Sequence, residues 1–210
     1  MKRNQSGFTL IEIAIVLVII GLLLGGVLKG QELINSAKVK NLATDFKNVP
    51  VFIYGYQDKF KALPGDDSAA TTHVGATATN GNGDGIIGGN WNAAAGESFN
   101  FWQQVRLAGL APGPTDTAAA DYLPRNATGG VIGVTNAANT AITGLKGSYI
   151  ICSNAIAGKF AKQLDITLDD GNPATGSLMV TAVDTATGGT PVANAAAIVD
   201  DTTYLVCMGV

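Results

Sequence analysis

Apolar residues fill the start of the chain almost without interruption. Positions 8–28 contain a single charged residue, Glu12. A helix rises about 1.5 Å per residue, so this run is long enough to cross the roughly 30 Å of hydrocarbon in a bilayer. The pattern therefore predicts a membrane-spanning helix over 8–28.

After this run the apolar residues return at spacings of three and four, which places them on one face of a helix. They are Val39, Leu42, Phe46, Val49, Ile53, Tyr56, Phe60 and Leu63. Charged residues fill the other faces, so we expect this face to pack on the chain's own globular head, with a coiled coil as the alternative. Pro50 is expected to bend the helix without ending it. One N-terminal helix is predicted from 8 to about 62.

The remaining sequence predicts short elements between long loops. Residues 66–92 are rich in Gly, Asn, Thr and Ala and cannot form long regular structure. Short helices are expected over 98–110, with Ser98 as the N-cap residue, and within 154–168, followed by a turn that begins with Asp169 and Asp170. Strands are expected near 131–135, 149–152, 178–183 and 204–208. The predicted fold class is α+β, a long N-terminal α-helix packed on a small antiparallel β-sheet with irregular insertions.

The distribution of charge predicts export. Lys2 and Arg3 precede the apolar run, and the next basic residue is Lys29. Basic flanks stay on the cytoplasmic side of a membrane helix, so the bulk of the chain should lie on the other side. The net charge of −3 provides no basic surface for phosphates, and no nucleic-acid partner is predicted.

The start of the apolar run carries a distinctive motif, Ser6-Gly7-Phe8-Thr9-Leu10-Ile11-Glu12, after a short basic leader. An ordinary signal peptide needs small residues after the run, and Val27-Leu28-Lys29 does not supply them. A permanent anchor gives no reason for a costly carboxylate inside the span. The motif resembles the class III signal of type IV prepilins and type II secretion pseudopilins.

This resemblance implies processing followed by filament assembly. In that family a prepilin peptidase cuts after the glycine, here Gly7, and methylates the new amine, here that of Phe8. The Glu12 carboxylate would then neutralise the Phe8 amine of a neighbouring subunit, inside an apolar bundle where an unpaired charge is costly. The implied partners are further filament subunits, the prepilin peptidase, the inner-membrane assembly machinery and, before assembly, membrane lipid.

The resemblance also implies a domain organisation and a location. The expected parts are a cleaved leader, a transmembrane and filament-core helix, its continuation on the head, and a globular head, over 1–7, 8–28, 29–63 and 64–210. The precursor would cross the inner membrane once with its head in the periplasm. The mature subunit would then reside in a surface pilus or a periplasmic pseudopilus.

The two cysteines, Cys152 and Cys207, lie in matching apolar contexts in the exported part of the chain. In an oxidising compartment two such cysteines most simply pair with each other. Metal binding is the weaker alternative, because the single histidine, His73, has no adjacent soft ligand. The bridge would bound a C-terminal segment similar to the disulfide-bounded region of many type IV pilins.

One segment of the glycine-rich region, Asn80-Gly81-Asn82-Gly83-Asp84-Gly85-Ile86, matches the first half of a calcium loop. Side-chain oxygens stand at alternate positions, and a glycine stands sixth. The proposed ligands are Asn80, Asn82, Asp84 and the Ile86 carbonyl.

The second half of the calcium pattern is incomplete. Its twelfth position is Trp91, so a carboxylate would have to come from elsewhere, from Glu97, Asp66 or Asp67. A series of Gly-Asn turns that binds no ion explains the same residues equally well. Calcium is the one candidate cofactor, and no cofactor is required.

Catalytic groups are not apparent in the sequence. His73 stands between Thr72 and Val74, with no recognisable nucleophile and base around it. We therefore interpret the chain as a structural filament subunit of a type IV pilus or pseudopilus and not as an enzyme. A minor or tip pilin and a type II secretion pseudopilin are alternatives, and a membrane-anchored periplasmic binding module or enzyme is a third.

Overall fold

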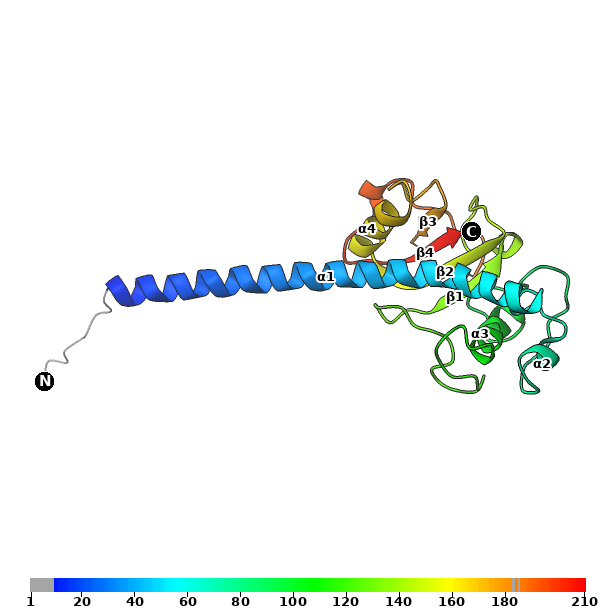
Figure 1. Cartoon of the computed structure of the whole chain (residues 1–210). Helices are drawn as coiled ribbons and strands as arrows, with labels where there is room; N and C mark the ends of the chain where they lie inside the picture. Colours follow the sequence, from blue (N-terminus) through cyan, green and yellow to red (C-terminus); the bar gives the residue numbers. More distant parts are fainter. Residues whose placement is uncertain (1–9, 183, 185) are drawn as a thin grey trace, which may run out of the picture. The chain divides into compact units, whose positions relative to one another are not determined.

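The computed structural model of the chain describes residues 10–182, 184 and 186–210. The chain divides into two compact units, residues 1–37 and residues 38–210. The helices within the described residues are α1 (Leu10–Phe60), α2 (Ala70–His73), α3 (Glu97–Leu107) and α4 (Gly158–Leu168). The strands are β1 (Ile132–Asn136), β2 (Tyr149–Ala157), β3 (Leu178–Thr181) and β4 (Thr203–Gly209), and Figure 1 labels these helices and strands.

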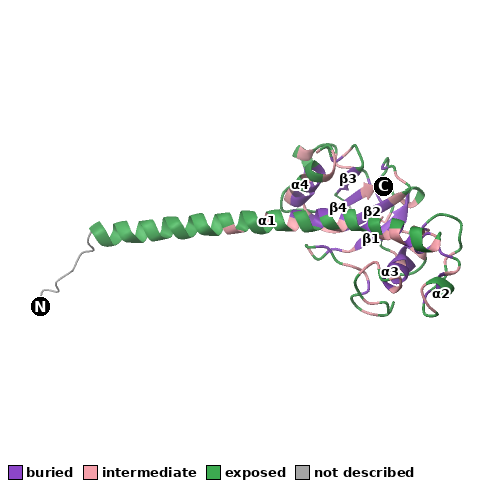
Figure 2. Cartoon of the chain, in the orientation of Figure 1, coloured by how far each residue is buried: buried purple, intermediate pink, exposed green. Residues whose placement is uncertain are grey.

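The first part of α1 is an apolar helix with an exposed surface. Figure 2 shows it as exposed, and its large apolar side chains from Leu10 to Ile34 have no cover within the described residues. Within the described residues, α1 is the one helix long and apolar enough to cross a membrane. The predicted apolar helix is therefore present, although residues 8 and 9 lie outside the described part of the chain.

The second part of α1 supplies one wall of the core of the second unit. Its buried residues are Val39, Leu42, Ala43, Phe46, Val49, Ile53 and Tyr56. All of them except Ala43 belong to the predicted apolar face, and they pack on the head of the same chain. Of the other predicted positions, Phe60 is half-buried at the end of the helix, and Leu63 is buried beyond it. The helix continues through Pro50 and ends at Phe60, where Lys61 adopts a positive φ of 57°.

A four-stranded antiparallel sheet forms the centre of the second unit, in the order β1-β2-β4-β3. One face of this sheet packs with α1, α3 and α4, where Ile151 and Val206 join the larger core cluster. The other face packs with loop residues such as Trp91 and Ile142. Because both faces are covered, the strands are buried along most of their length, including polar positions such as Thr135 and Ser153. The predicted α+β fold class is confirmed.

The C-terminal ends of strands β2 and β3 differ from the sequence expectation. Strand β2 continues to Ala157, whereas a helix was expected to begin near Asn154. The reason is nonlocal pairing, because Ile156 lies opposite Tyr204 in β4 beyond a break in register after Ser153. The expected strand 178–183 ends earlier, at Thr181, and residue 183 lies outside the described residues.

Helix α3 also begins differently from the expectation that Ser98 would cap it. The cap position is Gly96, and the Ser98 hydroxyl donates instead to the carbonyls of Gly88 and Gly89 at 2.8 and 3.1 Å. Ser98 therefore fastens the glycine-rich region to α3. The short α2 and the 3-10 helices Ala137–Asn139 and Ala195–Ala197 were not expected from the sequence.

Candidate functional site

The predicted processing and assembly residues lie at the start of the chain. Gly7 and Phe8 fall outside the described residues. Glu12 lies in the first turn of α1 and is followed by exposed apolar side chains such as Leu17, which is 64% exposed. A continuous exposed apolar surface of this kind requires a lipid or protein environment. This segment is the first candidate functional site.

The glycine-rich region is organised around Asp66, a carboxylate that is only 3% exposed. Its Oδ1 accepts hydrogen bonds from the backbone N–H groups of Gly83 and Asp84 at 2.8 and 3.0 Å. Its Oδ2 accepts from the N–H of Gly85 at 2.8 Å. Gly83 and Gly85 have φ values of 75° and 84°, which glycine adopts without strain. Asp66 thus holds the turn in place from a distant part of the chain.

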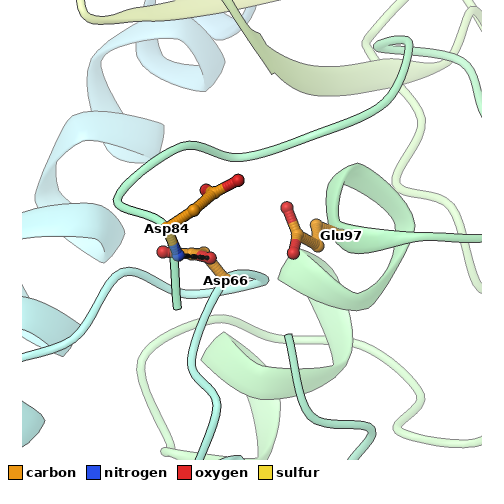
Figure 3. Close-up of side chains that lie close together, drawn as sticks. All are labelled: Asp66, Asp84 and Glu97. Atoms are coloured by element: carbon orange, nitrogen blue, oxygen red, sulfur yellow. Dashed lines mark hydrogen bonds between the residues drawn. The ribbon is translucent and has the colours of Figure 1, made fainter. Parts of the chain in front are cut away.

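Three carboxylates converge at this loop, as Figure 3 shows for Asp66, Asp84 and Glu97. Each provides an oxygen within 4.8 Å of the others. Glu97 reaches the loop from the first turn of α3, and it accepts from the N–H groups of Asn82 and Gly88 at 3.0 and 2.7 Å. The structure therefore brings together two predicted ligands, Asp84 and Glu97, and the candidate Asp66.

The other predicted ligands serve the loop itself. Asn80 Oδ1 accepts from the N–H of Thr71 at 2.9 Å. Asn82 Oδ1 accepts from the N–H of Asp84 at 2.8 Å, and Asp84 Oδ1 accepts from the N–H of Ile86 at 2.9 Å. Such bonds are those of side chains that stabilise turns. Calcium binding by Asn80, Asn82, Asp84, Ile86 and Glu97 stays a prediction.

Asp67, another candidate ligand, points into a different cluster that the sequence did not reveal. The Tyr56 hydroxyl donates to Asp67 Oδ2 at 2.7 Å, and His73 Nδ1 lies 2.7 Å from the same oxygen. The Ala69 N–H donates to Oδ1 at 2.9 Å. The His73 ring stacks on Phe60 with 5.3 Å between ring centroids. This cluster ties the end of α1 to the segment that follows it.

Burial and hydrogen bonding have opposite effects on the pKa of Asp67 in this cluster. Burial raises the pKa of Asp67, but hydrogen bonds from His73, Tyr56 and the Ala69 N–H outweigh it and hold the pKa below its usual value. Burial, together with the hydrogen bond to Asp67 and its charge, raises the pKa of Tyr56. The cluster is thus a charged aspartate held by three hydrogen-bonding groups, with the geometry of a structural anchor.

The predicted disulfide is present between Cys152 and Cys207. The two cysteines lie directly opposite each other on β2 and β4, and both are fully buried. The structure confirms this pairing. Neither cysteine is therefore available as a thiol nucleophile or a metal ligand.

A cavity of about 210 Å³ lies beside the buried face of α1, with Asp45, Trp102 and Arg125 among its lining residues. Burial raises the pKa of Asp45 to about 6. Within the described residues, Trp102 Nε1 has no hydrogen-bond partner. The cavity is smaller than the roughly 300–1,000 Å³ typical of small-molecule sites, so we assign it no ligand.

Comparison with known proteins identifies the N-terminal segment. The prokaryotic N-terminal methylation motif matches residues 2–28, which include Gly7, Phe8 and Glu12. The comparison with curated proteins finds no match. Residues 2–28 are thus a class III prepilin signal of the type IV pilin and pseudopilin kind, carried by a chain with a pilin-like α+β layout.

Proposed function

We propose that this chain is a structural subunit of a type IV pilus or pseudopilus-like filament and not an enzyme. The observation that carries the proposal is the prepilin signal at residues 2–28, which leads directly into an exposed apolar helix. A membrane and a filament core both supply the apolar surroundings that this helix needs. The head contributes surface and stability through its sheet and its disulfide.

The proposal includes a location and a maturation step. The precursor crosses the inner membrane once through α1, with its head in the periplasm, because Lys2 and Arg3 precede the apolar run. Prepilin peptidase then cuts after Gly7 and methylates the Phe8 amine. Cleavage removes Lys2 and Arg3, so the amine of Phe8 becomes the cationic group at the N-terminal end of the apolar run.

Assembly follows from the same segment. Burial of apolar surface stabilises association by roughly 25 cal/mol per Å², and α1 exposes its large apolar side chains from Leu10 to Ile34. The Glu12 carboxylate and the Phe8 amine of adjacent subunits would pair within that apolar core. The pairing would set the axial register, since each charge needs an opposite partner away from water.

Mass spectrometry of the subunit from cells tests the proposal. The expected mature chain begins at Phe8 and carries one added methyl group. Gly7→Leu should leave the full precursor in the membrane and abolish filaments. Gly26→Leu is the matched control, because Gly26 lies on α1 with open space around it, and it should be cleaved normally. An intact N-terminus in the native chain, or cleavage after the apolar run, would overturn the proposal.

A further inference from the structure

Three carboxylates gather at the C-terminal end of α4. Asp165 lies in the last turn of this helix, Asp169 is its C-cap residue, and Asp170 follows directly. Each supplies an oxygen within 4.8 Å of the others. The sequence explained Asp169 and Asp170 as turn residues, and nothing in the proposed filament function uses this cluster.

Asp165 is the unusual member of the group. Its side chain is only 1% exposed; the Gly171 N–H lies close to it, yet neither carboxylate oxygen accepts a hydrogen bond of good geometry within the described part of the chain. Buried polar groups are almost always paired, because an unpaired one loses its hydration without compensation. The Asp165 carboxylate therefore keeps lone pairs that a cation could bind.

Electrostatics at this helix end point to a positively charged partner. The C-terminus of a helix carries the negative end of the helix dipole, and the last turn of α4 has no basic residue. The two lysines of this helix that form ion pairs contact other residues, Lys159 with Asp201 and Lys162 with Asp200. Among the described residues, no lysine or arginine forms an ion pair with the three carboxylates of the cluster.

The other two side chains of the cluster, half-buried Asp169 and exposed Asp170, are held in position by the following loop. Asp170 accepts from the N–H of Asn172 at 2.8 Å and from the Thr175 hydroxyl at 2.8 Å. Asp169 Oδ2 accepts from the N–H of Leu178 at 2.8 Å, at the start of β3. A carboxylate oxygen has a second lone pair, so these bonds orient the group and leave it able to bind an ion.

We propose that Asp165, Asp169 and Asp170 bind a calcium ion at the end of α4. Ca²⁺ binds oxygen ligands at about 2.3–2.6 Å, so two ligands on opposite sides of the ion lie about 5 Å apart, which matches the spacing of these oxygens. The ligand set contains only oxygen, which suits a hard cation and not zinc. An irregular loop suits the flexible geometry of calcium better than the strict octahedron of magnesium.

The bound ion would connect α4 to β3. Asp165 belongs to the helix, and Asp169 is bonded to the first residue of the strand. Both elements lie between Cys152 and Cys207, in the segment that the disulfide closes. Calcium would therefore stiffen this segment, and this role does not depend on the filament assignment.

Hydrogen exchange of the purified full-length chain in detergent micelles tests the proposal. The chain is stripped of metal and then compared in chelator and in millimolar Ca²⁺. Amides of residues 165–178 should exchange at least several-fold more slowly with calcium, because binding to the native state alone suppresses local opening. Equal exchange of this segment in both solutions would overturn the proposal.

Substitutions in the two acidic clusters test where the calcium ion binds. Asp170→Asn lies on the exposed side of the cluster and keeps an oxygen for the Asn172 N–H, so the fold should persist while calcium affinity at 165–178 falls about tenfold or more. Asp84→Asn is the matched control in the other acidic cluster, and it should leave protection of 165–178 unchanged. Loss of that protection in Asp84→Asn but not in Asp170→Asn would overturn the assignment.

Two further measurements complete the test. Asp165→Asn removes the buried charge, so its melting temperature in chelator should equal or exceed that of the parent, and calcium should no longer protect residues 165–178. A variant that calcium protects like the parent would contradict the proposal. Titration with Mg²⁺ alone should protect the segment less than Ca²⁺, and equal protection at the same concentration would overturn the choice of calcium.

Discussion

The Tyr56 hydroxyl lies 2.7 Å from Asp67 Oδ2, and this bond joins the buried face of α1 to the first turns after it. Tyr56 is fully buried within the main core cluster. Asp67 is buried as well and accepts further bonds from His73 and Ala69. The end of the long helix is thus fixed by a charged hydrogen-bond network in addition to apolar packing.

Removing the Tyr56 hydroxyl tests this anchor. In Tyr56→Phe the ring remains in the core, but the buried Asp67 carboxylate loses one donor. Hydrogen bonds to charged groups contribute about 1.5–3 kcal/mol, so the free energy of unfolding should fall by about that amount. Urea denaturation of the full chain in detergent measures it. Tyr54→Phe is the control, since Tyr54 is exposed, and it should change stability by less than about 0.5 kcal/mol.

The same network predicts an acid-sensitive contribution to stability. The pKa of Asp67 in the folded chain lies below its unfolded value of 3.8. Its contribution is therefore fully present above the unfolded pKa and is lost as the pH falls through the folded pKa. Melting temperatures measured downward from pH 5 should show this loss, and Asp67→Asn should flatten the acid limb. If the melting temperature of the variant falls with the same slope at low pH, the loss of stability in acid arises from other groups.

The sequence predicted those elements whose residues form a local pattern. The spacing of Val39 to Tyr56 indicated the buried face of α1, and the matching runs before Cys152 and Cys207 indicated two strands. The end of β2 was missed because its extended conformation depends on pairing with Tyr204, which is distant in the sequence. Periodicity within one segment carries no information on such a partner.

Sequence patterns also did not reveal which polar side chains the fold brings together. The pattern from Asn80 to Ile86 revealed a tight loop, but the carboxylate that organises it, Asp66, lies outside the pattern. The cluster of Tyr56, Asp67 and His73 unites a helix and two later positions, and no motif has that spacing. Burial of Asp165 likewise depends on how α4 packs, which the sequence of its turn does not reveal.

The glycine-rich loop gives a third prediction, which separates calcium binding from simple turns. If Asp66, Asp84 and Glu97 hold an ion, calcium should protect residues 80–92 of the full chain from protease, and Asp84→Ala should remove that protection. Exposed Asp116→Ala is the control and should retain it. Equal cleavage of the parent in calcium and in chelator would show that this region binds no calcium and consists of turns that Asp66 holds in place.

Loss of the disulfide should weaken the head strongly. The bridge closes a loop with a sequence separation of 55, which in the chain-entropy model stabilises the folded state by about 4 kcal/mol. The Cys152→Ala, Cys207→Ala double variant should lose most of this, and reductant should lower the denaturation midpoint of the parent but not of the variant. Equal midpoints for parent and variant without reductant would contradict the expected contribution.

The final prediction concerns Glu12, the single charged residue of the apolar run. Under the proposed function, Glu12→Ala spares cleavage after Gly7 and membrane insertion, because it makes the run more apolar. The number of filaments should fall sharply or to zero, because the Phe8 amine would be left buried without its partner. Removing one member of a buried ion pair costs about 3–5 kcal/mol, here at every subunit contact. Electron microscopy of surface or periplasmic filaments, with mass spectrometry of the cleaved subunit, measures the two effects separately.

A matched acidic residue on the same helix controls for the loss of charge alone. Glu32 is exposed and pairs with Lys29 at 2.7 Å, an exposed contact that contributes little. Glu32→Ala should therefore assemble normally. If Glu12→Ala also forms filaments in normal number, the amine and carboxylate do not set the register, and apolar contacts along α1 alone must position the subunits. If Glu12→Ala blocks cleavage, the carboxylate acts before assembly, in recognition by the peptidase.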